Sequence, residues 1–284
     1  MSYKNAASAT PTLLKITRLH PFEGHPYKVQ DNAEMDALVE SIRVNGILAP
    51  LIVRPVENGG EYEVVSGHRR LRAARKAGLT ELPVLIRALD RDSAAIAVVD
   101  SNLHREHILP SEKAFAYKLK MEALSHRGIT CGQVGHKSRD DISDTDSGRQ
   151  VQRYIRLTCL IPELLEKMDK GEIALSVGVE LSYLDESSQR EVLEQCVIND
   201  CTPSYSQAWR MHKAGREGLL TKDVIQFLMS EEKANQRETV KVPASRLREV
   251  LPKGLDAGKT EDFIIKACEY YRKYLIRQRS RDER

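Results

Sequence analysis

The sequence lacks any long apolar run, because none of its hydrophobic stretches approaches the ~20 residues that a membrane-spanning helix needs. Its five cysteines form an odd, scattered set without a CxxC pair, so nothing indicates a disulfide framework. The first residues, MSYKNAASATPT, are polar and lack the apolar segment of a signal peptide. These absences predict a reduced, cytoplasmic protein without membrane contact.

A large charge excess is also lacking. The 44 basic and 41 acidic residues give a net charge of only +3, which excludes a polycation. Any affinity for nucleic acid must therefore come from local clusters of basic side chains. The 284 residues are 41% hydrophobic and 30% charged, a composition that predicts two or three globular domains.

The first third of the chain alternates between strand-like and helix-like segments. Strands are predicted at 13–17, 51–56, 62–65 and 83–89, and the turn ENGG joins the second and third into a hairpin. One helix is capped by Asp31 or Asn32 and ends at Gly46, and another covers 68–77 and ends at Gly78. The pattern predicts a small mixed α/β domain.

After Pro110 only helical patterns follow. Ser111 is a candidate cap for a helix to about residue 127, and 128–135 and 148–160 resemble the two helices of a helix-turn-helix. The polar residues 136–146 between them are predicted to be a loop. It is either a specificity insertion or a disordered segment, and we favour disorder. The expected organisation is α+β overall, with a flexible tail (1–12), the α/β domain (13–110), a helical DNA-binding domain (111–216) and a helical, dimerising C-terminal region (217–284).

Two apolar features concern the helical part. Phe263, Ile264, Ala267, Tyr271 and Leu275 recur at helical spacing before a basic end, which predicts a dimerising helix with a possible nonspecific DNA contact. Trp209, the single tryptophan, is expected in the core rather than on a stacking surface.

The segment VVSGHRRLRAARKAGL, residues 64–79, combines five basic side chains with no acidic one. A surface helix with solvated charges is the simpler interpretation of such a cluster. Here, however, the cluster starts at a strand-to-helix turn containing Gly67, where free backbone N–H groups and the positive helix end favour an anion. Arg69 and Arg70 add fork-shaped donors suited to phosphate oxygens. The segment therefore predicts a polyphosphate site.

Residues 101–118 supply a second group of polar side chains. The amide oxygen of Asn102 is suited to a hard cation that also touches phosphates. His104 and His107 have the spacing of a metal pair, but no third ligand is evident, so we interpret them as ordinary polar residues.

The helix after Ser147 has the pattern of a recognition helix. Val151 and Ile155 are expected to pack inward, and Ser147 to cap the helix. An ordinary amphipathic helix with a polar face is the alternative. In the DNA-binding interpretation, the side chains that meet base edges near its N-terminal half are Arg149, Gln150, Gln152 and Arg153.

The ordered segments ESIRVNGILAPLIVRPV, YEVVSGHRRLRAARKAGLTELPVLI and SNLHREHILPSEKAFAYK, followed by a helix-turn-helix, resemble the ParB-type partition proteins of plasmids, chromosomes and mobile elements. The resemblance covers residues 13 to about 185. It implies a ParB/sulfiredoxin-like N-terminal domain that binds CTP and Mg²⁺, and a helix-turn-helix that binds a palindromic, centromere-like site in double-stranded DNA. It further implies a homodimer that CTP closes into a sliding clamp, a ParA-type ATPase as partner, and a location on the nucleoid or a plasmid.

By position, the resemblance implies that Gly67, Arg69 and Arg70 hold the triphosphate and that Asn102 coordinates magnesium. The residues 46–50 would border the nucleotide. The complete expected nucleotide-binding set is Gly46, Ser66, Gly67, His68, Arg69, Arg70, Asn102 and Arg105, and the expected metal ligands are Asn102 and Glu106.

Three residues depart from the family pattern. The family commonly has Glu at the position of His68, a Glu-Asn pair at the position of Ser101-Asn102, and Gln at the position of Ala49. Both missing carboxylates lie where metal binding and water activation would be managed. We therefore expect CTP binding with at most weak hydrolysis, and the catalytic residues stay unknown.

Two rival functions remain open. A helix-turn-helix transcriptional regulator without nucleotide switching would explain the missing carboxylates. A nuclease or small-molecule kinase on the N-terminal fold would need acidic or nucleophilic residues around the phosphate loop, and that loop offers only His68.

Overall fold

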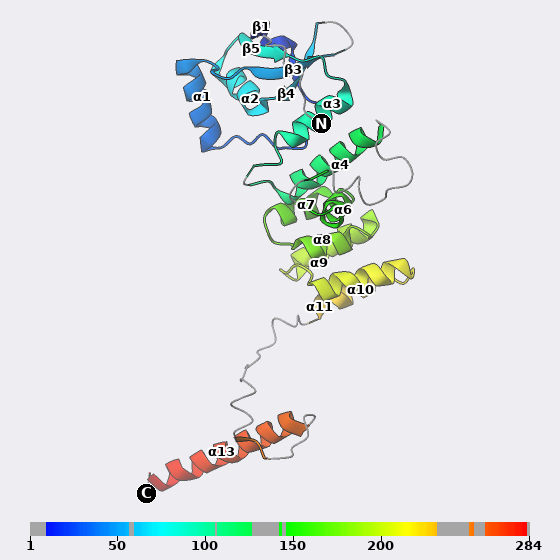
Figure 1. Ribbon diagram of the computed structural model, residues 1–284. Coiled ribbons are helices and arrows are strands. Elements are labelled where there is room, and N and C mark those ends of the chain that lie inside the picture. Colours follow the sequence, from blue (N-terminus) through cyan, green and yellow to red (C-terminus); the bar gives the residue numbers. More distant parts are fainter. Residues whose placement is uncertain are drawn as a thin grey trace. The chain divides into compact units, whose positions relative to one another are not determined.

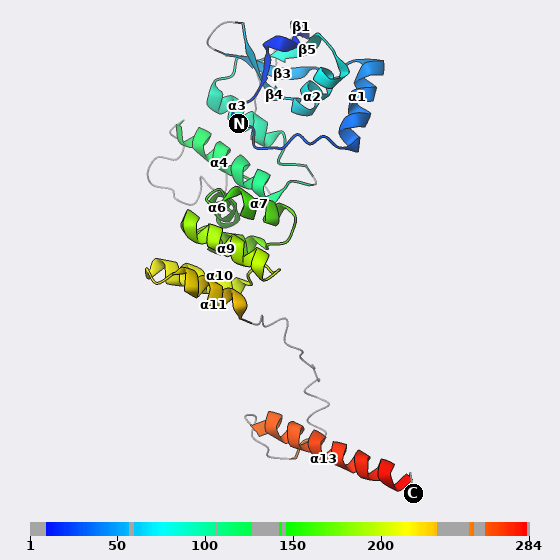
Figure 2. The same ribbon diagram turned by 180° about the vertical axis from the view of Figure 1, so that it is seen from behind.

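The computed structural model describes residues 10–56, 60–105, 107–126, 142–143, 146–231, 250–252 and 259–282. The chain divides into two compact units, Met1–Glu231 and Glu232–Arg284 (Figures 1 and 2). Glu106, Cys131 and the predicted first helix of the helix-turn-helix, 128–135, lie outside the described residues. Within the described ranges, no helix is both long and apolar enough to cross a bilayer.

The first unit begins with a five-stranded mixed sheet in the order β1-β5-β3-β4-β2. The predicted hairpin is confirmed, because β3 and β4 pair antiparallel. β1 is antiparallel to β5, whereas β5 is parallel to β3 and β2 is parallel to β4. The strands are β1 (Thr12–Lys15), β2 (Leu19–Pro21), β3 (Leu51–Pro55), β4 (Tyr62–Ser66) and β5 (Glu81–Ile86), with the 3₁₀ helix η1 (Ile16–Arg18) after β1.

Helices cover both faces of this sheet. Successive strand residues point to opposite faces, so Val64 packs in one core with Leu71 of α2 (His68–Ala77), while Val65 packs in another with Val98 of α3 (Arg91–Asp100). α1 (Ala33–Asn45) lies against α2 through a third apolar cluster. The predicted mixed α/β domain is confirmed.

α1 and α2 begin and end where the sequence indicates. The side chain of Asn32 accepts a hydrogen bond from the backbone N–H of Met35, so Asn32 is the cap of α1. Asp31 instead pairs with Arg72 and Lys76 of α2. Gly78 ends α2 with a left-handed backbone at φ 79°.

α4 (Pro110–His126) belongs to both parts of the first unit (Figure 1). Ala116 packs with α3 against the sheet, Ala114 enters the core of the following helices, and Tyr117 packs with Ile142 and Val151. A helix that is buried on several sides carries apolar residues around most of its circumference. α4 therefore joins the α/β part to the helical part through continuous packing.

The predicted cap of α4 was wrong. The helix begins at Pro110, and Ser111 bonds to another helix instead: its backbone N–H and hydroxyl donate to the two carboxylate oxygens of Asp169 at 3.0 and 2.6 Å. A carboxylate distant in sequence thus accepts a hydrogen bond from a backbone N–H group in the first turn of this helix. Of the loop 136–146, only 142–143 and 146 are among the described residues, and there the expectation of disorder was wrong. Ile142 is buried, and Asp146 accepts a hydrogen bond from Tyr117 at 2.5 Å.

The remaining helices of the first unit share one apolar core. α11 contributes Ile225, Leu228 and Met229 to this core. The predicted dimerising role of residues 217–284 stays a prediction. Trp209 was expected in the core but is 48% exposed. The helices are α6 (Gly148–Leu157), α7 (Pro162–Asp169), α8 (Leu175–Leu181), α9 (Glu186–Ile198), α10 (Tyr205–Arg216) and α11 (Lys222–Ser230).

The second unit contains the long helix α13 (Thr260–Asp282). The predicted C-terminal helix is therefore present. Several of its large apolar side chains are exposed, among them Tyr271 and Leu275. Helices that expose such residues commonly bury them against a partner.

Candidate functional site

A cavity of about 240 Å³ lies where the end of β4, the start of α2 and the segment after α3 meet. Among the residues that line it, four are cationic and none is acidic, so the cavity favours an anion. The lining residues are His25, Tyr27, Lys28, Val29, Ser66, Gly67, His68, Arg69, Arg70, Ser101, Asn102 and Arg105.

Gly67 forms the turn between β4 and α2. Its φ is 106°, and an added Cβ would lie 3.0 Å from Cγ of Leu51 and 3.2 Å from Nη2 of Arg70. The position therefore requires glycine both for its backbone conformation and for its close approach to neighbours. Gly67 is the N-cap residue of α2 but has no side chain that could accept a hydrogen bond. The first backbone N–H groups of α2 therefore have no side-chain cap, and they start at the turn that borders the cavity.

The two arginines after this turn have different surroundings. Arg70 is half-buried and donates to the backbone carbonyls of Ala49 and Pro50, the latter at 3.1 Å, and burial lowers the pKa of its guanidinium. Arg69 is more exposed and pairs with Glu34 of α1 at 2.9 Å. Arg70 is thus fixed beside the turn, whereas Arg69 is held by an exchangeable surface ion pair.

His68 lies against a second histidine, which no sequence pattern had indicated. The rings of His68 and His25 are 3.7 Å apart between centroids. Nε2 of His68 accepts the backbone N–H of Phe22 at 3.3 Å, and Nδ1 of His25 donates to the carbonyl of Tyr27 at 2.9 Å. Burial lowers the pKa of His68 to about 3, and the neighbouring His25 and Arg105 lower it further in the same direction. His68 is therefore neutral near pH 7.

Asn102 is buried, and its amide is oriented by hydrogen bonds. Nδ2 donates to the carbonyl of Val98 at 2.7 Å and to Oγ of Ser101 at 3.1 Å. These bonds leave Oδ1 as the amide atom for a ligand, since no described residue donates to it. The described lining residues supply no carboxylate, so they suit a cation held mainly by ligand oxygens rather than by a protein cage.

The structure brings together most, but not all, of the predicted nucleotide-binding residues. Of those residues, Ser66, Gly67, His68, Arg69, Arg70, Asn102 and Arg105 line the cavity. Gly46 ends α1 and is not among the lining residues, and Glu106 lies outside the described residues. Their roles stay predictions.

Sequence reasoning missed the 25–29 segment, which lines the cavity from the loop after β2. Arg105 lies over the ring of Tyr27, with Cζ 5.6 Å from the ring centroid. Lys28 reaches the helical part, where its ammonium group lies 3.1 Å from Asp169. The sequence HPYK, residues 25–28, contains basic and aromatic side chains of the kind that line anion sites. Nothing in the sequence, however, places this segment near residues 66–70.

α6 has the features predicted for a recognition helix. Ser147 caps it, since its side chain accepts the N–H of Gln150 at 3.3 Å, and Val151 is fully buried. Arg149 and Gln152 are exposed, whereas Gln150 accepts a hydrogen bond from Arg153 at 3.2 Å. The four side chains thus share the outer part of one helix, and their contact with DNA stays a prediction.

Comparison with known proteins adds the family. Residues 2–103 match the ParB N-terminal domain family. The probable chromosome 1-partitioning protein ParB of Deinococcus radiodurans is 34% identical over 206 residues, which cover 72% of this chain and 67% of that protein. The chain belongs to the ParB family. The match to this ParB relative spans about two thirds of its length.

Two solved ParB structures were also found. One is the C-terminally truncated Caulobacter crescentus ParB complexed to the centromeric parS site, with 22% identity, a TM-score of 0.42, and coverage of 71% of this chain and 98% of that chain. The other is the C-terminally truncated protein from the same organism complexed with CTP-γ-S, with 24% identity, a TM-score of 0.32, and coverage of 66% and 98%.

We predict that His68 makes the fold sensitive to acid. Its pKa is about 3 in the folded protein and near 6.5 when unfolded, so between these values the unfolded chain binds a proton that the folded chain does not. The free energy of unfolding therefore falls as the pH is lowered below 6.5. At pH 5 the loss from this group is about 2 kcal/mol relative to pH 7.5.

Urea unfolding at both pH values measures this effect. His68→Gln should show a smaller loss on acidification, and the exposed His104→Gln should keep the wild-type loss. An equal loss in wild-type protein and His68→Gln would contradict the prediction.

Proposed function

We propose that this chain is a sequence-specific DNA-binding partition protein whose DNA engagement is gated by CTP. The observation that carries the proposal is the cavity at Gly67, which combines a helix start with four cations and no carboxylate among its described lining residues. Such a site suits a polyphosphate, because backbone N–H groups and guanidinium forks both donate to phosphate oxygens.

CTP with Mg²⁺ is the ligand that the family resemblance implies. Gly67 and Arg70 would border the phosphates, and Oδ1 of Asn102 would contact the cation. When bound, the cation would neutralise part of the phosphate charge. His25 and His68, whose rings are in contact, would line the cavity, where their neutral rings avoid adding charge repulsion to the arginines.

DNA binding is assigned to α6. Its capped N-terminus carries the exposed Arg149, and the buried Val151 fixes the helix to α4. A recognition helix needs this combination of a rigid inner face and free polar side chains near its first turns. The partner we propose is a palindromic duplex site, bound in the cytoplasm on a nucleoid or plasmid.

A homodimer is the proposed assembly, because a palindromic site matches a two-fold symmetric protein. The exposed apolar side chains of α13 would supply the dimer contact. A ParA-type ATPase is the proposed protein partner, by the family resemblance alone.

A transcriptional regulator without nucleotide switching is the second candidate. It is favoured by one observation: the lining positions 68 and 101 hold a neutral histidine and a serine where the family commonly has glutamates. Titration with CTP separates the two candidates, because only the partition protein is expected to bind the nucleotide. A nuclease or kinase is less well supported, because no described lining residue is a carboxylate.

We predict selective binding of CTP over ATP, GTP and UTP, measured by calorimetry with Mg²⁺. Arg70→Ala should weaken CTP binding by about 1.5 to 3 kcal/mol, the usual cost of losing a hydrogen bond from a charged group. Arg72→Ala is the matched control, since Arg72 lies on the same helix but pairs with Asp31 and does not line the cavity. Unchanged affinity in a folded Arg70→Ala variant would remove this site from the proposal, and no nucleotide binding by the wild type would favour the regulator.

Hydrolysis of bound CTP should be slow or undetectable. Cleavage requires a water placed in line and charge stabilisation on the phosphoryl oxygens, and the described cavity offers arginines but no carboxylate to orient a metal-bound water. Phosphate release from the purified protein, with and without cognate DNA, measures turnover. Brisk DNA-stimulated turnover that survives His68→Ala would contradict this expectation and point to Glu106.

Specific duplex binding should depend on α6. Sequencing the DNA that co-purifies from the native cell supplies the site, and binding to that duplex is then measured by anisotropy. Arg149→Ala should cost about 1 to 3 kcal/mol and relax specificity at one base position if the side chain contacts a base. Arg190→Ala is the control, because Arg190 pairs with Glu186 on the exposed side of α9. A uniform loss across sequences would mean that Arg149 contacts a phosphate.

A further inference from the structure

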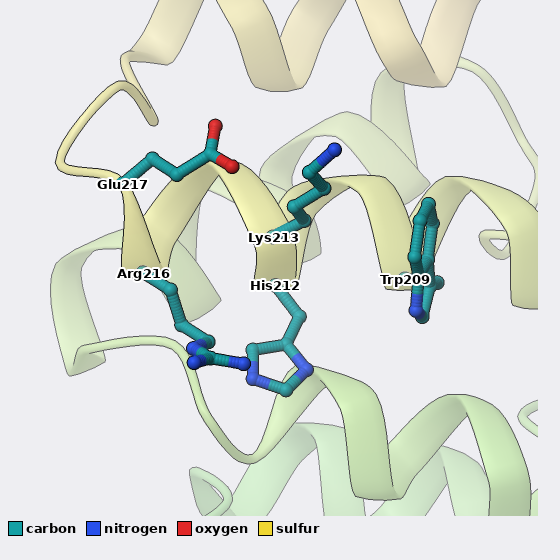
Figure 3. A pocket seen from close by; sticks show the side chains of 5 residues that line it. All are labelled: Trp209, His212, Lys213, Arg216 and Glu217. Carbon is teal, nitrogen blue, oxygen red and sulfur yellow. The ribbon is translucent and has the colours of Figure 1, made fainter.

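A second concave surface lies on α10, apart from the nucleotide cavity. It has a volume of about 380 Å³ and is lined by Trp209, His212, Lys213, Arg216 and Glu217. Figure 3 shows Trp209, His212 and Arg216 on one side of α10, with the guanidinium group of Arg216 beside the imidazole of His212. Trp209 is 48% exposed, and Nζ of Lys213 lies 5.8 Å from the centroid of its ring.

The surface connects to α6 through a stack of side chains. Arg156, near the end of α6, lies over Tyr183 with Cζ 4.2 Å from the ring centroid. Tyr183 in turn stacks on His212, with centroids 4.2 Å apart and an interplanar angle of 1°. Arg156 is held there by a hydrogen bond of 2.9 Å to the carbonyl of Ser182. The stack therefore joins the recognition helix to α10.

The cations along this path have no carboxylate partner among the described residues. On α6, the positions of Arg149, Arg153 and Arg156 fall at i, i+4 and i+7, which is one face of a helix. Their face continues through Tyr183 to α10, where Lys213 and Arg216 also form no ion pair within the described part of the chain.

Two other cations of the helical part have carboxylate partners. Arg210 on α10 pairs with Glu231, and Lys222 pairs with Glu191. Two carboxylates lie nearby, and one of them, Glu180, pairs with His212 at 2.6 Å. The other, Glu217, lines the surface and is outnumbered by the three cations Arg156, Lys213 and Arg216. The surface thus keeps an excess of positive charge.

We propose that this basic-aromatic surface (Arg156, Tyr183, Trp209, Lys213 and Arg216) is a second contact for the phosphate backbone of duplex DNA. The proposal rests on the proposed binding of DNA by α6, and adds a sequence-independent contact beyond that helix. Unpaired cations in line with a recognition helix fit the evenly spaced phosphates of a duplex. The aromatic rings hold the cations in place, and Trp209 covers one end of the surface.

Trp209 is the only tryptophan of the chain, so its emission reports directly on this surface. We expect a random-sequence duplex at low salt to change Trp209 emission, and added salt to reverse the change. The double variant Lys213→Gln/Arg216→Gln should lower the slope of log affinity against log salt by about 1 per lost phosphate contact. Lys213→Arg/Arg216→Lys keeps both charges and should restore the slope.

Arg210→Gln is the matched control, since Arg210 lies on the same helix but pairs with Glu231. It should leave the emission change and the salt slope as in the wild type. The inference is wrong if the wild type binds duplex without a change in Trp209 emission and the double variant has the same salt slope as the wild type. That outcome would leave α6 as the DNA contact. Absence of all duplex binding would instead contradict the proposed function. Emission that responds to polyglutamate but not to duplex would also overturn it, in favour of an acidic protein partner.

Discussion

The backbone at Gly67 changes direction from β4 into α2 with a φ of 106°, and the arrangement of the cavity depends on this turn. It sets Arg70 beside Leu51, allows that arginine to bond the carbonyls of Ala49 and Pro50, and presents the start of α2 to the cavity. A side chain at this position would collide with the residues that the turn brings together. The anion site is therefore a property of the backbone as much as of the arginines.

In addition to the apolar packing of α4, a small group of hydrogen bonds around this helix links the cavity to the helical part. Asp169 of α7 accepts from Ser111 and pairs with Lys28, while Glu112 accepts the backbone N–H groups of Lys28 and Leu109. Lys28 also lines the cavity. A ligand that competes for Lys28 would thus alter a contact between the α/β part and α7, which gives the proposed gating a physical route.

His68, at a position where the family commonly has Glu, affects the chemistry of the cavity but not its position in the fold. A carboxylate at this position would supply oxygen ligands for a cation, whereas the buried imidazole is neutral and already accepts the N–H of Phe22. Phosphate binding needs only the turn and the cations, but water activation needs a group that anchors a metal or takes a proton. For this reason we expect the cavity to bind CTP but to hydrolyse it slowly or not at all.

The sequence by itself determined the local elements. Glycines with positive φ, the cap at Asn32 and apolar periodicity specified α1, α2 and the β3–β4 hairpin, because each depends on neighbouring residues. Tertiary structure alone decided the contact between the His25 and His68 rings, the hydrogen bonds from Ser111 to Asp169, and the exposure of Trp209. These features join residues far apart in the chain or depend on which face of a helix is covered, and local propensity carries no information about either.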